Sequence, residues 1–168
     1  MDVKLLRIDS RLLHGQVATD WAKNANVERI LIVCDQAASD SIRKTLLIQA
    51  APPGLKVHVL TLAKMIRLSR DERFSKLKVL ILVENPIDAM RLVSGGVGVS
   101  SINLGSLSFD ATRKMITETI AVNEQDIVAL TWLKKRGIEL DYRKVSSDPK
   151  RDLWKVLCDK GLVNEEQS

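Results

Sequence analysis

The sequence predicts an α/β protein with an open, mostly parallel, twisted β-sheet and helices on both faces of that sheet. Strand-like and helix-like patterns alternate along almost the whole chain, which is typical of strand–helix–strand units. The apolar run at residues 79–83 shows no polar alternation, as expected for a parallel strand buried on both faces. At 168 residues, 45% hydrophobic and 28% charged, the chain has the size and composition of one globular domain, which we place at residues 1–168.

The first half of the chain predicts three strands, each followed by a helix. Apolar residues begin to recur with helical spacing after the first strand. Asp40 is a suitable N-cap for a helix that Pro52-Pro53-Gly54 ends. The expected strands are residues 3–6, 29–34 and 56–60, and the expected helices are residues 16–23, the segment from the Asp40 cap to residue 50, and residues 62–68.

The second half repeats this alternation. Asn85 followed by Pro86 gives an N-cap with proline at the first helical position, and Asn123 with Asp126 three residues on resembles a capping box. Asp148 is expected to start the last helix. The expected strands are residues 77–83, 101–104 and 138–145, and the expected helices are residues 86–94, 123–137 and 148–158, with a frayed polar tail at residues 164–168.

Composition narrows the class of protein. Charged residues interrupt the N-terminus before a signal-peptide core could form, and apolar runs of five residues are too short to cross a bilayer. We therefore expect a cytoplasmic protein without direct membrane insertion. Cys34 and Cys158 are expected to be reduced thiols, with Cys34 a small core residue. The net charge of +5 is spread along the sequence and signals nucleic-acid binding only weakly, whereas an acidic protein partner explains it as well.

The loop after the first strand carries residue types that suit phosphoryl transfer. In an open parallel sheet, ligands bind beyond the carboxyl ends of the strands, and there this loop places His14 directly before a helix N-terminus. A neutral imidazole is a nucleophile toward phosphorus, and Gly15 lets the backbone amides from Gln16 onward approach an anion. Arg11 could offer its planar fork to phosphoryl oxygens, and Asp9 could hold an arginine or the histidine ring.

Spacing alone leaves a second interpretation open, in which His14 is an ordinary loop histidine and the arginines are surface charges. Asp35 and Glu84 also follow strands, and helix capping is the favoured role for both. His58 lies between apolar neighbours and is expected to be structural. No pair of histidines or cysteines has ligand spacing, so the sequence predicts no metal site.

The eleven residues Arg-Ile-Asp-Ser-Arg-Leu-Leu-His-Gly-Gln-Val at positions 7–17 resemble a known signature loop. It is that of the enzyme IIB component of the mannose/fructose/sorbose family of bacterial sugar phosphotransferase systems. Three further landmarks occur in the family's order: residues 50–57, Asn103-Leu104-Gly105, and the helix start at residues 122–127. The similarity therefore spans essentially the whole sequence, whose length agrees with a free-standing IIB domain.

The resemblance implies a phosphohistidine carrier without a metal or diffusible cofactor. His14 would accept a phosphoryl group at Nδ1 from the IIA component and pass it to a sugar bound by the membrane-embedded IIC and IID components. Arg11, with Arg7 as a second candidate, would hold the phosphoryl oxygens, and Asp9 would orient the loop. The family commonly has a second glycine where this chain has Ser106. If that position needs a positive φ, serine costs on the order of 1 kcal/mol; alternatively, its hydroxyl could reach the phosphoryl group.

Three other functions share part of this pattern. A regulatory phosphohistidine protein that does not feed transport needs the same loop, so the sequence does not separate it from a transport subunit. An aspartyl-phosphate receiver requires paired acids after its first strand, whereas Asp9 stands alone. A hydrolase with His14 as base would need a nucleophile elbow such as Gly-x-Ser-x-Gly, which is absent from the sequence. The sequence leaves open which sugar is transported and whether the protein forms a homo-oligomer.

Overall fold

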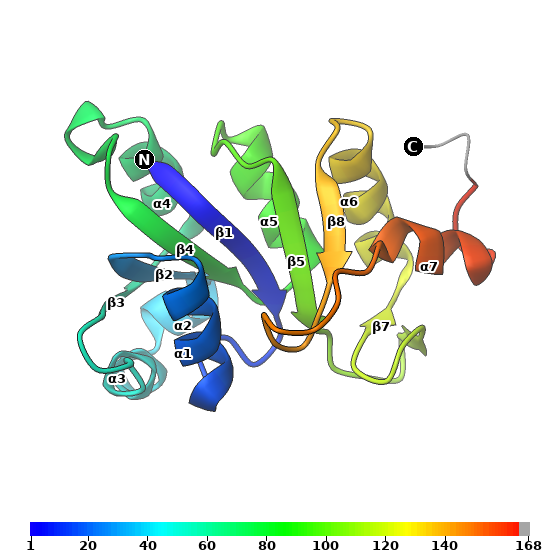
Figure 1. The fold of residues 1–168 in the computed structure, drawn as a ribbon, viewed down its shortest axis with the longest axis horizontal. Coiled ribbons are helices and arrows are strands. Elements are labelled where there is room, and N and C mark those ends of the chain that lie inside the picture. Colours follow the sequence, from blue (N-terminus) through cyan, green and yellow to red (C-terminus); the bar gives the residue numbers. More distant parts are fainter. Residues whose placement is uncertain (165–168) are drawn as a thin grey trace.

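The structure is a computed structural model that describes residues 1–164. Its centre is a six-stranded sheet with the strand order β3-β2-β4-β1-β5-β8, and all the strand pairings within that sheet are parallel (Figure 1). The predicted open parallel sheet is thus confirmed, and all six carboxyl ends lie at one edge. The strands are β1 (Asp2–Asp9), β2 (Arg29–Val33), β3 (Lys56–Leu60), β4 (Lys78–Val83), β5 (Ser101–Ser106) and β8 (Glu139–Tyr142).

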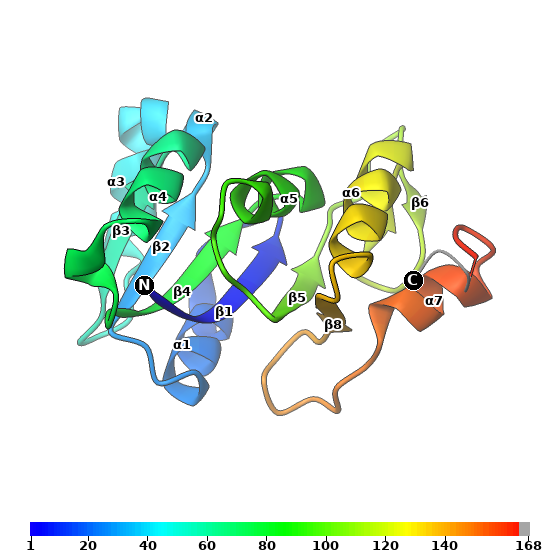
Figure 2. The same ribbon diagram turned by 90° about the horizontal axis from the view of Figure 1, so that it is seen from above.

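Helices cover both faces of the sheet, as predicted. Seen from above, α4, α5 and α6 lie along one face and α1 lies on the other (Figure 2). The buried side chains of α2 and α3 belong to the same apolar cluster as those of α1, whereas α7 packs beside β8 with the other cluster. The helices are α1 (Gly15–Asn24), α2 (Asp35–Ser39), α3 (Ser41–Gln49), α4 (Leu62–Ser69), α5 (Pro86–Ser94), α6 (Glu124–Lys134) and α7 (Leu153–Asp159).

The two faces of the sheet bury separate apolar clusters, and this explains the unbroken hydrophobic runs in the sequence. Along β2, Ile30 and Ile32 belong to one cluster, whereas Leu31 and Val33 belong to the other. Successive side chains of a strand point to opposite faces, so a strand covered on both sides needs apolar residues at every position. The same division occurs along β4.

Most predicted helix starts are confirmed by their capping contacts. The carboxylate of Asp40 accepts hydrogen bonds from the amides of Ile42 and Arg43 and so caps α3. Asn85 caps α5, which begins at Pro86 as predicted. At α6, Asn123 and Asp126 form the reciprocal capping box.

Several boundaries differ from the prediction. The last helix begins at Leu153, because Asp152 caps it, whereas the carboxylate of Asp148 closes a turn with the amide of Val145. Helix α6 ends three residues before Gly137, and β5 continues through Ser106. The sequence also gave no signal for α2, for a short 3₁₀ turn at Glu72–Phe74, or for the hairpin of β6 (Lys114–Met115) and β7 (Ala121–Val122).

None of the helices in residues 1–164 has the length and apolar character needed to span a bilayer. Residues 164–168 were expected to form a frayed tail. Residues 165–168 lie outside the described residues, so this expectation stays a prediction.

Candidate functional site

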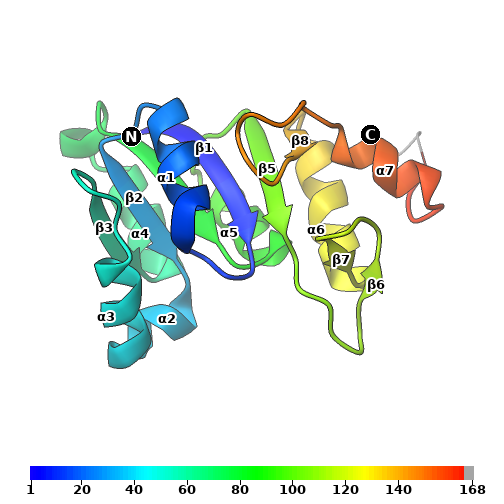
Figure 3. The ribbon, with the colours of Figure 1, turned by 60° about the horizontal axis from the view of Figure 1, so that its bottom comes forward.

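The loop between β1 and α1 lies at the carboxyl edge of the sheet, where the sequence placed it. Figure 3 shows this loop below the arrowhead of β1, while the loop after β8 turns back toward α1. The amide of Leu12 donates to the carbonyl of Asp9 at 2.9 Å and closes a turn, and Leu12 has a φ of 57° while its side chain is buried. A leucine with a left-handed backbone conformation is strained. We infer that the packing of the buried Leu12 side chain compensates for this strain and holds the turn.

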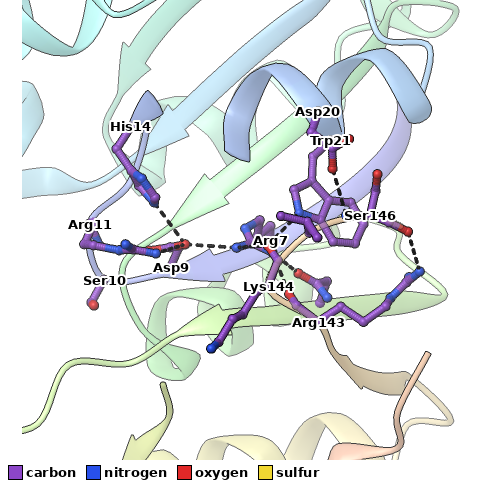
Figure 4. A network of polar contacts seen from close by, with 12 residues as sticks. Arg7, Asp9, Ser10, Arg11, His14, Asp20, Trp21, Arg143, Lys144 and Ser146 are labelled. Atoms are coloured by element: carbon purple, nitrogen blue, oxygen red, sulfur yellow. Dashed lines mark hydrogen bonds and ion pairs between the residues drawn. The ribbon is translucent and has the colours of Figure 1, made fainter. Parts of the chain in front are cut away.

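Asp9 is the centre of the polar network, and its side chain is 1% exposed (Figure 4). Its carboxylate accepts from Nη2 of Arg7 at 3.0 Å and from the amide and Nε of Arg11 at 3.1 and 3.2 Å. Burial alone would raise the pKa of Asp9, but hydrogen bonds from Arg11 and the charges of Arg7 and Arg11 outweigh it and hold the pKa below its usual value. Asp9 is therefore a carboxylate at neutral pH.

His14 faces this carboxylate through its Nε2 atom. Nε2 lies 3.3 Å from Oδ2 of Asp9, and the His14 side chain is 27% exposed. A carboxylate only accepts hydrogen bonds, so the contact requires a proton on Nε2. In the neutral ring the lone pair is then on Nδ1, which makes Nδ1 the nucleophilic atom.

Arg11 lies beside His14 on the outer side of Asp9. Its Nε and Nη2 atoms face the carboxylate, and its side chain is 54% exposed. Among the atoms that the structure describes, which exclude the side chains of residues 16–18, no hydrogen-bond acceptor contacts Nη1 of Arg11. Asp9 thus holds the guanidinium at the surface while leaving part of its fork available to an incoming anion.

The N-terminus of α1 adds backbone donors to the site. His14 is the N-cap residue of α1 and makes no side-chain capping bond, so it leaves the first amides of the helix open to a ligand. Gly15 has a φ of +45°, a left-handed conformation that glycine adopts without strain. Gln16 lies in the first turn of α1, and its side chain is outside the described residues.

Arg7, the second arginine of the predicted site, is an interior residue with 2% exposure. Its Nη1 donates to Oδ1 of Asn103 and to the carbonyl of Arg143, and its Nη2 donates to Asp9 and to the carbonyl of Lys144. A Cβ atom built on Gly105 would overlap this guanidinium, so Gly105 makes room for it. Both terminal nitrogens of Arg7 are thus occupied by protein acceptors.

Trp21 of α1 closes the inner side of this network. Its ring lies 5.2 Å from the guanidinium carbon of Arg7 and 5.0 Å from that of Arg143, and its Nε1 donates to the carbonyl of Lys144. Two buried or half-buried cations on one indole ring gain cation–π stabilisation. The amide of Ser146 also donates to Asp20 at 2.8 Å, and Asn24 donates to the hydroxyl of Ser146, so three hydrogen bonds join α1 to the loop after β8.

Ser106 ends β5 next to Asp9 and is 8% exposed. Its carbonyl accepts from the amide of Ser10 at 3.0 Å, and the hydroxyls of Ser10 and Ser108 are 2.7 Å apart. Among residues 1–164, Leu12 and Asn26 are the non-glycine residues with positive φ, so Ser106 is not strained. The hydroxyl of Ser106 has no hydrogen-bond partner within the described part of the chain.

Two other strand-end acids lie outside this network. Asp35 was expected to cap the helix that follows it, but Cys34 is the N-cap of α2, and the carboxylate of Asp35 instead accepts from the amide of Leu62 at the start of α4, whose N-cap is Thr61. The capping role predicted for Glu84 is wrong: its carboxylate binds Cys34 and Arg43, and the neighbouring Asn85 caps α5 instead. Across residues 1–164, no cluster of three or more His, Cys, Asp or Glu side chains could hold a metal ion.

Sequence reasoning missed the residues that enclose Arg7. The sequence shows Asn103 and Gly105 only as a landmark of the family, and it gives Trp21 no role beyond its place in the predicted helix at residues 16–23. The role of the carbonyls of Arg143 and Lys144 could not be predicted from the sequence, because every residue has a backbone carbonyl whatever its side chain.

Comparison with known proteins adds to this geometry. The family model described as "PTS system sorbose subfamily IIB component" matches residues 3–168. The mannose-specific EIIAB component of Escherichia coli K12 is 49% identical over 157 residues, which cover 94% of this chain and 49% of that protein. The chain thus spans about half the length of this relative. The sorbose-specific EIIB component of Klebsiella pneumoniae is 42% identical over 149 residues, covering 89% of this chain and 91% of that protein.

Solved structures show the same architecture. The IIB domain of the sorbose permease from Klebsiella pneumoniae superimposes with a TM-score of 0.92 at 39% identity, covering 95% of this chain and 98% of that one. The N-acetylgalactosamine-specific IIB component 1 from Escherichia coli superimposes with a TM-score of 0.83 at 28% identity, covering 90% of this chain and 99% of that one.

Proposed function

This chain belongs to the IIB components of the mannose/fructose/sorbose family of sugar phosphotransferase systems, and we propose that His14 is its phosphoryl-carrying residue. The observation that carries the proposal is the contact between Nε2 of His14 and the buried carboxylate of Asp9. It leaves Nδ1 unprotonated in the neutral ring, on a residue that another protein can reach. The IIA component is the proposed donor, and a sugar held by the IIC and IID components is the proposed acceptor.

Transfer onto this chain is a single displacement at phosphorus. The lone pair of His14 Nδ1 forms a bond to phosphorus as the P–N bond of the donor phosphohistidine breaks, and the donor nitrogen takes the bonding electrons. Nε2 keeps its proton throughout, so the phosphorylated ring carries a positive charge that the Asp9 carboxylate offsets. In the second transfer a sugar hydroxyl attacks phosphorus and gives its proton to water, while Nδ1 leaves with the electron pair and the ring returns to its neutral form.

Three sets of donors stabilise the negative charge of the transferred group. Arg11 supplies the guanidinium nitrogen that Asp9 does not occupy, and the amides of Gly15 and Gln16 supply the helix N-terminus. The hydroxyl of Ser106 is a further proposed donor, since it has no partner among the described residues. Arg7 does not contact the transferred group, because protein acceptors occupy both of its terminal nitrogens. It acts indirectly, by holding the carboxylate of Asp9.

The exposure of the site supports transfer between proteins. A nucleophile that receives its group from another protein must lie at the surface, and His14 and Arg11 are 27% and 54% exposed while Asp9 is 1% exposed. We infer that residues 1–168 act as one IIB domain on the cytoplasmic side of a membrane transporter.

The test is phosphorylation by a donor IIA protein that carries radiolabelled phosphate. We expect a label on His14 that is labile in acid and stable in base, and no label on His14→Ala. Label that persists in His14→Ala, or that maps to another residue, would remove His14 from the mechanism. Replacing Ser106 by Ala should slow transfer without removing the label; an unchanged rate would exclude its hydroxyl from the site.

A further inference from the structure

Behind the proposed phosphoryl site lies a pair of buried residues that the displacement itself does not use. Asn103 on β5 is 1% exposed and Asp141 on β8 is 3% exposed. Nδ2 of Asn103 donates to Oδ2 of Asp141 at 3.0 Å, and Oδ1 of Asn103 accepts from Nη1 of Arg7. An ionised carboxylate only accepts hydrogen bonds, so the Asp141 carboxylate must face the NH₂ group of the Asn103 side chain. The amide oxygen of Asn103 therefore points at Arg7.

Asp141 is itself held in place. Nε and Nη2 of Arg143 lie 2.9 and 2.8 Å from its Oδ2, and the amide of Arg151 donates to Oδ1 at 3.4 Å. A carboxylate held by a guanidinium fork and a backbone amide has little freedom to rotate. Asp141 is thus a fixed point from which Asn103 is oriented.

The same contacts continue to the histidine. Nη2 of Arg7 donates to Oδ2 of Asp9, and this is the oxygen that faces Nε2 of His14. The four residues Asp141, Asn103, Arg7 and Asp9, which we call the Asn103 network, connect three neighbouring strands of the sheet to one ring nitrogen. Figure 4 shows the last part of this network, from Arg7 through Asp9 to His14. Arg11 holds Oδ1 of Asp9 through its amide and Nε, whereas Arg7 makes the shorter of the two guanidinium contacts to Oδ2, so Arg7 helps to fix the oxygen that faces the ring.

We infer that Asn103 is a positioning residue that selects the ring nitrogen of His14. By holding Arg7, it keeps Asp9 in the orientation that occupies Nε2, and the lone pair that attacks phosphorus therefore lies on Nδ1. When Asp9 turns away, the ring can place its proton on Nδ1 instead. The P–N bond then forms at Nε2, and the donor P–N bond still breaks with its electrons returning to the donor. This inference rests on the proposed role of His14 as phosphoryl carrier.

The test reads out which nitrogen is phosphorylated, using a phosphorylated IIA protein as donor. The two phosphohistidine isomers are distinguished by NMR of the labelled protein. Asn103→Leu keeps the approximate volume and removes both hydrogen bonds. We expect wild-type protein to carry the group at Nδ1, and Asn103→Leu to carry a substantial share at Nε2. The rate of phosphorylation should fall on the order of tenfold or more, because the nucleophile is no longer held in its reactive geometry.

Two controls separate positioning from general stability. Asn123→Ala removes the N-cap of α6 far along the chain, destabilises the fold, and should leave the label at Nδ1. Asn103→Asp alone opposes two carboxylates and should also lose selectivity. Combining it with Asp141→Asn restores one donor and one acceptor between the two positions and conserves net charge, so the double variant should recover Nδ1 labelling. A purely structural role predicts that the label stays at Nδ1 in the single and the double variant alike.

The outcomes are distinguishable. A folded Asn103→Leu that keeps both the rate and Nδ1 labelling would overturn the inference and leave the carrier role of His14 intact. Absence of label on wild-type His14 would contradict the proposed function itself. If Asn103→Leu does not fold, the comparison of Asn103→Asp with the double variant decides: equal labelling patterns in the two would also overturn the inference.

Discussion

Position 105 requires glycine because a side chain from a neighbouring strand fills the space beside it, and not because its own backbone conformation demands glycine. The guanidinium of Arg7 occupies the space where a Cβ would lie, and this guanidinium is buried and bonded on two sides. Adding a methyl group must therefore displace a buried cation from its partners. Breaking a buried ion pair is far more costly than losing an exposed one, because it leaves uncompensated charge in the interior.

We predict that Gly105→Ala lowers the free energy of unfolding by about 3 kcal/mol or more and slows phosphorylation of His14. Urea denaturation and the labelling assay would measure the two effects. The matched control is Gly98→Ala, because Gly98 is exposed, has no positive φ and has no atom within 4 Å of an added Cβ. That control should change stability by less than about 1 kcal/mol. Equal stability of the two variants would contradict the described position of Arg7.

Arg11 offers the opposite case, because its charge is proposed to act in the chemistry and contributes little to folding. Its side chain is 54% exposed, so its ion pair with Asp9 is screened on the outer side. We predict that Arg11→Lys slows transfer on the order of tenfold or more, because a point charge replaces a planar fork. Unfolding should change by less than about 1 kcal/mol. Arg73→Lys, at an exposed pair with Asp71, is the control and should have neither effect. A normal transfer rate in Arg11→Lys would exclude Arg11 from the site.

At the scale of elements, the carboxyl end of β2 carries a buried thiol. Cys34 caps α2 by accepting from the amide of Ala37, and its Sγ donates to Glu84 at 3.0 Å. Burial, together with the neighbouring carboxylate of Glu84, raises the pKa of Cys34 from the ordinary thiol value of 9.0 to about 11. The protonated thiol is the form that the fold favours. Its contribution to stability is fully present below pH 9.0 and is lost as the pH rises through about 11.

We predict that Cys34 resists alkylation in the folded protein. At pH 8 a thiol with the higher pKa has about a hundredfold less thiolate, which is the reacting form. Iodoacetamide labelling followed by peptide mass spectrometry should show Cys34 labelled slowly in buffer and rapidly in urea. Glu84→Gln removes the negative charge beside the thiol and should speed the reaction in the folded state. Similar labelling rates with and without urea would contradict the buried, protonated thiol.

Elements that begin with a polar cap were predictable from the sequence, and elements defined by long-range pairing were not. Asp40, Asn85 and the Asn123 capping box each marked a helix start, because capping is a local interaction. The last helix was placed too early because two aspartates precede it, and only the tertiary structure decides which one caps. Asp148 bonds the amide of Val145 and Asp152 caps α7.

At the scale of the whole molecule, the sequence located the loop of the proposed phosphoryl site but not the residues that support it. The first-strand loop is contiguous, so residue types alone brought Asp9, Arg11 and His14 together. The support is assembled by the strand order: β5 lies beside β1, and β8 lies beside β5, so Asn103 and the loop after β8 reach Arg7 from the far end of the chain. Local sequence patterns do not determine the order of strands in a sheet. Only the resemblance to a family therefore indicated that residues outside the loop belong to the site.

The distribution of charge over the sheet edges bears on how a donor protein approaches. The net charge is +5, and His14 and the exposed side chain of Lys144 both lie on loops at the carboxyl edge. Lys56, also exposed, opens β3 at the opposite edge. An acidic donor face should be attracted to the carboxyl edge, and this attraction should weaken as salt screens it.

We predict that Lys144→Glu weakens association with phosphorylated IIA on the order of tenfold at low salt, whereas Lys56→Glu leaves it nearly unchanged. Both variants change the net charge by the same amount, so a difference between their affinities for IIA reports the effect of where the charge lies. The carbonyl of residue 144 remains available to Arg7 and Trp21, because the substitution changes only the side chain. Surface plasmon resonance across a salt series would measure both variants, and the difference between them should vanish at high salt. If affinity for IIA does not depend on salt, or if the two variants weaken it equally, electrostatic docking at the carboxyl edge is excluded and the positive charge serves another purpose.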